Sequence, residues 1–170
     1  GTLSDASEWG LFGVATWQPS GKTRVQGRLG YINREYDSAG TRDFSGLEAR
    51  VEADWAPTGK SLLNAAVYRE LNESDLGVSN NYAEVMGLDL SGQWQPLPKT
   101  RVGPFLRLEN RSYDGTSVDD DYVSFGLRAN YQPWPGGDIG LTVQRATRDS
   151  TVAAREFRST SIGLTAVLAF

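Results

Sequence analysis

The chain contains 170 residues, with 17 Lys and Arg against 21 Asp and Glu, and it has neither His nor Cys. A formal charge of −4 argues against a nucleic-acid partner, because such partners bind basic surfaces. The lack of His and Cys excludes imidazole and thiol catalysis, disulfides, and zinc sites built from these side chains. We therefore expect no metal and no cofactor. The length suits a single domain, residues 1–170.

A turn motif recurs along the chain at intervals of 37 to 39 residues. Its copies begin at Trp17, Trp55, Trp94 and Tyr131, and each of these aromatic residues is followed two positions later by Pro. Pro lacks an N–H group and ends strand pairing, and the Gly and Pro residues that follow favour a tight reversal. Longer segments rich in Asp, Asn, Ser and Gly lie between the copies and predict loops around residues 37–43, 72–81, 112–121 and 147–156.

Between the turns and the loops, apolar and polar side chains alternate with a period of two, which is typical of β-strands. Leu47, Val51 and Trp55 fall on one face of such a segment, and Glu48 and Glu52 fall on the other. The sequence predicts nine strands, at residues 9–17, 23–36, 44–55, 61–71, 82–94, 100–111, 122–132, 138–148 and 157–170. Their short connections predict an all-β, antiparallel up-and-down β-barrel.

The alternation does not say which face of the strands points outward. A soluble ligand-binding barrel would bury Leu47 and Val51 in its core, whereas a transmembrane barrel would turn them towards lipid. No apolar run in the sequence is long enough for a transmembrane helix. Barrel strands, however, cross a bilayer with a polar average composition, so a membrane location stays open.

Two patterns favour the transmembrane barrel. The aromatic residues Trp17, Trp55, Trp94 and Tyr131 share the apolar face at one strand end, as in an aromatic girdle at a lipid–water boundary. The turns at that end are short and the loops at the other end are long, as in outer-membrane barrels. The apolar face is therefore expected to contact outer-membrane lipid.

In a transmembrane barrel the charged faces of the strands line the lumen. The predicted lumen-lining charges are Arg24, Arg28, Glu48, Arg50, Glu52, Asp54, Glu70, Asp89, Arg107, Glu109 and Arg128. Poorly hydrated charges must be paired. These residues could therefore form a salt-bridge lattice that fills a small barrel. Alternatively, they could form a charged constriction that selects a solute in a wider pore. Three rings, Tyr36, Tyr68 and Phe105, are predicted to face inward, where they could stack on sugars.

The last predicted strand carries a pattern of apolar residues at every second position, Ile162, Leu164, Ala166, Leu168 and Phe170. This pattern resembles the C-terminal signal of Gram-negative outer-membrane β-barrels, which the barrel assembly machinery recognises. The resemblance implies a location in the bacterial outer membrane, with the short turns on the periplasmic side.

The turn motif, written Trp-x-Pro-Thr-Gly-Lys in its second copy, is similar to a hairpin of the outer-membrane barrels of exopolysaccharide biosynthesis and export systems. The similarity is best over residues 44–111. It implies a porin-like channel for polysaccharide export, with polysaccharide and periplasmic export components as partners. The alternative is a small filled barrel that anchors a surface or export assembly without conducting. An enzyme is not expected, because barrel hydrolases of known type need a His.

The predicted strand number bears on completeness. If the C-terminus is periplasmic, the first of nine strands runs from the cell surface towards Trp17. Complete bacterial barrels usually have an even number of strands and both ends in the periplasm. We therefore expect this chain to be the C-terminal part of a longer, even-numbered barrel.

An acidic run, Asp119 to Asp121, is the remaining motif with potential chemistry. Carboxylates can bind Ca²⁺, but the spacing of these residues matches no EF-hand loop. We interpret the run as a solvated acidic surface loop.

Overall fold

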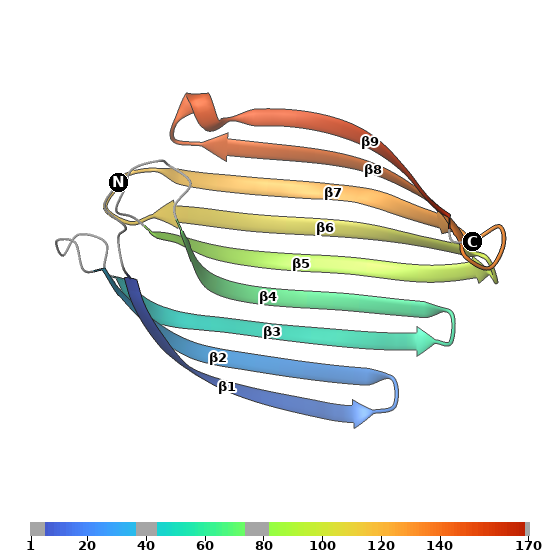
Figure 1. Cartoon of the computed structure of the whole chain (residues 1–170), viewed down its shortest axis with the longest axis horizontal. Coiled ribbons are helices and arrows are strands. Elements are labelled where there is room, and N and C mark those ends of the chain that lie inside the picture. Colours follow the sequence, from blue (N-terminus) through green and yellow to red (C-terminus); the bar gives the residue numbers. More distant parts are fainter. Residues whose placement is uncertain (1–5, 37–43, 74–81, 169–170) are drawn as a thin grey trace.

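The computed structural model describes residues 6–36, 44–73 and 82–168, which form one antiparallel sheet of nine strands (Figure 1). Each strand pairs with the next along the chain, so the order in the sheet is the order in the sequence. The strands are β1 (Ala6–Ser20), β2 (Thr23–Tyr36), β3 (Phe44–Thr58), β4 (Ser61–Glu73), β5 (Tyr82–Leu97), β6 (Thr100–Tyr113), β7 (Asp119–Tyr131), β8 (Gly137–Ser150) and β9 (Phe157–Leu168). A short 3₁₀ helix, η1 (Ala153–Arg155), lies between β8 and β9. This architecture confirms the predicted nine-stranded, up-and-down all-β fold.

Three strands extend beyond the aromatic residue at which they were predicted to end. In β1, β3 and β5 the register shifts after Trp17, Trp55 and Trp94, and pairing resumes three residues later. The reason is the Pro two positions after each Trp, which cannot donate a ladder hydrogen bond and is accommodated in an irregularity of the strand. Two-residue connections then close these hairpins. We call the end of the strands at which these hairpins lie the turn end, and the opposite end of the strands the loop end.

The strand register sorts the side chains onto two faces, because residues that pair across antiparallel strands point to the same side of a sheet. The pairs Arg24↔Asp54 and Asp89↔Arg107 illustrate this. One face, which we call the charged face, carries every predicted lumen residue: Arg24, Arg28, Glu48, Arg50, Glu52, Asp54, Glu70, Asp89, Arg107, Glu109 and Arg128. The opposite face, which we call the apolar face, carries the Trp, Leu and Val residues of the alternation.

Burial is inverted relative to a water-soluble protein. On the apolar face Leu47, Val51 and Leu127 are 55%, 52% and 48% exposed, whereas on the charged face Glu109 and Asp120 are only 8% and 0% exposed. A soluble barrel would bury the first three side chains together and expose the other two. The arrangement agrees with a transmembrane barrel wall and not with a soluble barrel.

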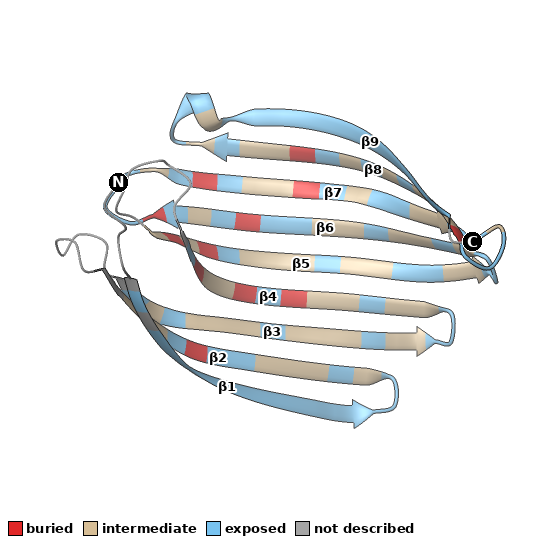
Figure 2. Cartoon of the chain, in the orientation of Figure 1, coloured by how far each residue is buried: buried red, intermediate tan, exposed pale blue. Residues whose placement is uncertain are grey.

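Among the described residues the sheet is open: β1 pairs only with β2, and β9 pairs only with β8. Figure 2 shows that both of these edge strands are exposed wherever their burial is described, while the buried positions lie on strands between them. No helix within the described ranges is long and apolar enough to cross a membrane.

Candidate functional site

The middle of the charged face carries a network of ion pairs that begins at Arg50 on β3. Its guanidinium donates to Glu52 Oε1 at 2.5 Å and to Glu70 Oε1 of β4 at 3.2 Å, and it lies 4.9 Å from the ring centroid of Tyr68. The strand pairing Arg50↔Tyr68 brings these groups together. One arginine is thus held by two carboxylates and one aromatic ring.

Glu109 on β6 continues this network and is buried. Its Oε1 accepts a hydrogen bond of 2.9 Å from Tyr68 Oη, and its Oε2 pairs with Arg111 Nη2 at 2.6 Å. Arg107 on the same strand pairs with Asp89 Oδ1 of β5 at 2.8 Å. Buried carboxylates need such partners because desolvation is otherwise costly. We call the connected set the ion-pair lattice: Arg50, Glu52, Tyr68, Glu70, Asp89, Arg107, Glu109 and Arg111.

Three aromatic rings of the charged face lie against glycines of the following strand. A Cβ atom added to Gly30, Gly87 or Gly126 would fall 2.1, 2.2 or 2.6 Å from a ring atom. The rings can therefore lie close to the backbone only because these positions carry no side chain. The strand pairs are Phe12↔Gly30, Tyr68↔Gly87 and Phe105↔Gly126.

Each of these three rings also contacts an arginine of the charged face. The guanidinium carbons of Arg28, Arg50 and Arg128 lie 4.3, 4.9 and 4.2 Å from the ring centroids of Phe12, Tyr68 and Phe105, respectively, which is cation–π distance. We call these three groups the seated arginines. Two of them also have carboxylate partners, since Arg28 lies 3.9 Å from Glu48 and Arg50 pairs with Glu52 and Glu70. Within the described part of the chain Arg128 has no ion pair.

A polar cavity of about 310 Å³ lies on the charged face between β5 and β8. It is lined by Asp89, Arg107, Tyr122, Ser124, Arg128 and Gln144, together with the Phe105 ring. Gln144 Nε2 donates to Ser124 Oγ at 2.9 Å, and Asp89 is paired with Arg107. The cavity therefore combines neutral hydrogen-bonding groups, one neutralised ion pair and one additional cation.

Asp120, at the loop end of β7, is fully buried, which corrects for this residue the interpretation of the acidic run as a solvated loop; Asp119 and Asp121 are exposed. Its carboxylate accepts hydrogen bonds from Ser150 Oγ at 2.5 Å, Tyr113 Oη at 3.1 Å and Arg155 Nη2 at 2.7 Å. Arg155 belongs to η1, so this ion pair holds the β8–β9 connection against β7. Alternation places Asp120 on the charged face with Tyr122 and Ser124, and that signal was available in the sequence.

The acidic run also does not assemble a cation site. Asp121 points to the other face, where its Oδ1 accepts a hydrogen bond of 2.9 Å from Asn110. Asp120 is occupied by its own donors. Across the described ranges no cluster of three or more His, Cys, Asp or Glu residues has a metal-binding arrangement.

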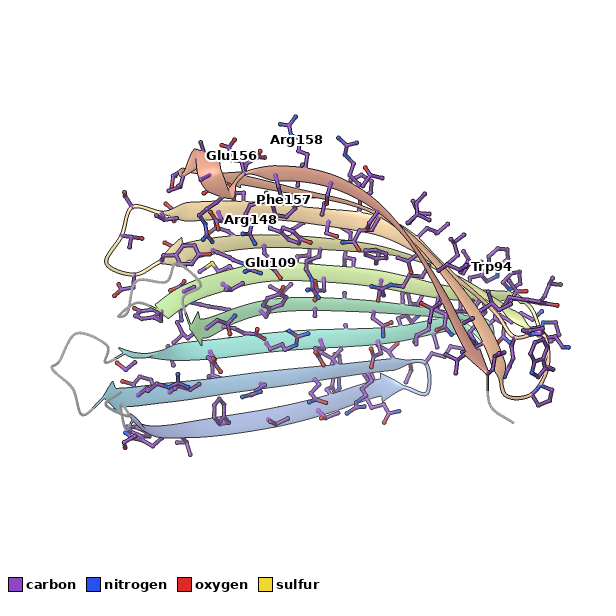
Figure 3. All side chains as sticks on the ribbon, turned by 45° about the horizontal axis from the view of Figure 1, so that its top comes forward. Trp94, Glu109, Arg148, Glu156, Phe157 and Arg158 are labelled. Carbon is purple, nitrogen blue, oxygen red and sulfur yellow. The ribbon has the colours of Figure 1, made fainter. Side chains whose placement is uncertain are left out.

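The predicted girdle residues Trp17, Trp55, Trp94 and Tyr131 are exposed on the apolar face. All of them lie at the turn end, where each precedes a hairpin connection, and Figure 3 shows Trp94 there, far from Glu156 at the loop end. On β9, Ile162, Leu164, Ala166 and Leu168 are also exposed on the apolar face, in register with β8. Phe170 lies outside the described residues. The membrane and assembly roles of both sets remain predictions.

More aromatic rings share the charged face than the sequence predicted. Tyr68 and Phe105 lie there as expected, and the side chain of Tyr36 is outside the description. The register adds Phe12, Tyr113, Tyr122 and Phe157 to this face. The position of Phe157 could have been read from its odd spacing from the Ile162 series, and that of Phe12 from its odd spacing from Trp17.

Solved structures of an outer-membrane protein of Vibrio cholerae, OmpT, are similar to this chain in fold. The in-vitro folded protein in its trimer form has a TM-score of 0.64 and 12% sequence identity, over 96% of this chain and 56% of that one. The loop L8 deletion mutant OmpTdeltaL8 has a TM-score of 0.63 and 14% identity, over 96% of this chain and 53% of that one. This chain thus spans about half the length of the matched structures.

Sequence comparisons give the family. No curated protein matches the sequence significantly. The family described as "Putative beta-barrel porin 2" matches residues 15–170, which is most of the chain. Together with the inverted burial and the nine-stranded sheet, this match establishes that the chain belongs to that family and is a porin-like β-barrel protein of the bacterial outer membrane.

Proposed function

We propose that the charged face lines the lumen of a channel and that the apolar face meets outer-membrane lipid. The observation that carries this proposal is the inverted burial, because only a hydrocarbon environment stabilises a surface on which Leu47 and Val51 are exposed while Glu109 is buried. Membership in a porin family agrees with passive conduction and with a protein that is not an enzyme.

A conducting pore fits the charged face better than a filled barrel does. In a filled barrel the lattice would cross the lumen and satisfy every charge. Here Arg128 and Arg148 contact rings, Phe105 and Phe157, and neither has a carboxylate partner among the described residues. Arg148 Nε is buried and has no hydrogen-bond partner within that same part of the chain. Cations left in this state are suited to ions and solutes that pass along the wall.

We propose that the channel exports a polysaccharide. Aromatic faces can pack against the apolar faces of pyranose rings. The charged face offers Phe12, Tyr68, Phe105, Tyr113, Tyr122 and Phe157, and three of these rings lie close to the backbone over glycine. The resemblance of the turn motif to barrels of exopolysaccharide systems points the same way. Periplasmic export components and the barrel assembly machinery are the partners of this proposal.

Planar-bilayer recording of the full-length protein tests conduction. We expect steady single-channel currents that are interrupted in a dose-dependent manner by soluble oligosaccharides. Currents without such interruptions would remove the polysaccharide cargo but keep the channel. Silence of correctly inserted protein, verified by its heat-modifiable migration on gels, would leave the filled anchoring barrel, for which the ion-pair lattice is the supporting observation.

A further inference from the structure

The charged side chains that line the polar cavity between β5 and β8 are Asp89, Arg107 and Arg128. Asp89 and Arg107, which both line it, neutralise each other at 2.8 Å. Ser124, Gln144 and Tyr122 are uncharged, and Gln144 already donates to Ser124. Arg128 is the one group of the lining that adds a net charge. The cavity thus has a net charge of one positive unit.

Comparison of the seated arginines shows that Arg128 is the exception. Arg28 and Arg50 have the same ring contact, but each also has a carboxylate nearby: Glu48 at 3.9 Å for Arg28, and Glu52 and Glu70 for Arg50. Within the described ranges Arg128 has the ring alone. An arginine that lacks an internal acid and borders a cavity is available to an acid from outside.

The guanidinium of Arg128 is also positioned in advance. Phe105 is seated over Gly126, and the guanidinium carbon lies 4.2 Å from the centroid of that ring. A planar guanidinium that stacks by its face keeps the N–H groups at its edge free for a bidentate carboxylate. Little conformational entropy is then lost when an anion binds.

We propose that this cavity is a subsite for one carboxylate-bearing sugar unit, such as a uronate residue of an anionic polysaccharide. This inference rests on the proposed function, whose cargo it narrows to an acidic glycan. The carboxylate binds the edge of Arg128, and the sugar hydroxyls reach the Asp89 carboxylate, Ser124 and Gln144. The cavity volume of about 310 Å³ lies at the small end of the range for ligand pockets, which suits a single sugar unit. The single net positive charge suits a monoanion.

Calorimetric titration of the detergent-solubilised full-length protein tests the subsite. The probe is sodium glucuronate, and glucose serves as its neutral counterpart. We expect glucuronate to bind more tightly than glucose, and we expect R128Q to weaken glucuronate binding by about tenfold or more, the loss typical of a charge-assisted hydrogen bond. The matched control is R101Q, because Arg101 lies exposed on the charged face of β6 and outside the cavity lining, yet its substitution removes the same charge.

The outcomes distinguish a failure of the subsite proposal from a failure of the channel proposal. Equal glucuronate affinity in wild type and R128Q, an equal loss in R101Q, or absence of binding to the wild type would each overturn the subsite. These results are independent of bilayer currents, so a silent protein that binds glucuronate through Arg128 would overturn conduction alone. If R128Q does not insert, R128K carries the test: it keeps the charge but loses the planar fork, and we expect weaker binding of glucuronate.

Discussion

Two regions of the charged face stabilise their arginines in different ways. In the ion-pair lattice on β3 to β6, carboxylates hold Arg50, Arg107 and Arg111, and the buried Glu109 joins the strands. On β7 and β8, Arg128 and Arg148 rest on aromatic rings and lack such acids within the described chain. The lattice joins neighbouring strands through ion pairs, whereas the ring-supported region would leave positive charge available to solutes in the channel that we propose.

The largest effect on stability is expected from E109A, which removes the central carboxylate of the ion-pair lattice. Arg111 and Tyr68 would lose their common acceptor, and we expect a loss of about 2–3 kcal/mol in the free energy of unfolding, less than for a fully buried pair because the arginines are partly exposed. Urea titration in detergent micelles measures this loss. E109Q keeps an acceptor for Tyr68 and should lose less. Unchanged stability in E109A would show that the lattice does not stabilise the wall.

An intermediate effect is expected from G87A, which tests the seating of Tyr68. The added Cβ would fall 2.2 Å from Tyr68 Cζ, so the ring must move and the hydrogen bond to Glu109 is lost. We expect a cost of about 1–3 kcal/mol, typical of overpacking. The matched control is G163A on the charged face of β9, where nothing lies within 4 Å of the new Cβ. Equal unfolding midpoints for G87A and G163A would contradict the close packing of the Tyr68 ring against Gly87.

The smallest effect on stability, but a clear one on ion selectivity, is expected from R148Q. Because no acid among the described residues pairs with Arg148, its loss should lower the free energy of unfolding by only about 0.5 kcal/mol, the contribution of the ring contact with Phe157. R50Q, in contrast, leaves Glu52 and Glu70 without their shared partner and should cost about 1 kcal/mol. Reversal potentials in a salt gradient should show a lower anion preference in R148Q. A larger stability loss in R148Q than in R50Q would contradict the inference that carboxylate-held arginines stabilise the wall more than ring-supported arginines do.

The sequence predicted the strands and their faces well because both depend on local patterns. The period of two assigned Glu48, Arg50 and Glu52 to one face without reference to any neighbour, and the register agrees. The predicted strand ends were less accurate, because Pro19 and Pro57 interrupt the pairing only locally and the strands pair again beyond them.

Two contacts of the site join segments that are not neighbours in the sheet, and for this reason they could not be predicted. Tyr68 on β4 reaches Glu109 on β6 across the intervening strand, and it does so only because Gly87 on β5 has no side chain. The burial of Asp120 depends on Arg155, which lies in the connection after β8. No spacing in the sequence encodes either distance.

In the channel that we propose, the glycines beneath Phe12, Tyr68 and Phe105 would also affect the width of the lumen. A ring that stood upright on the wall would project by its full length and narrow the bore. Packed against Gly30, Gly87 and Gly126, the same rings lie close to the backbone and would project less into the lumen. Such a wall would offer contact area to the proposed polysaccharide with little narrowing of the lumen.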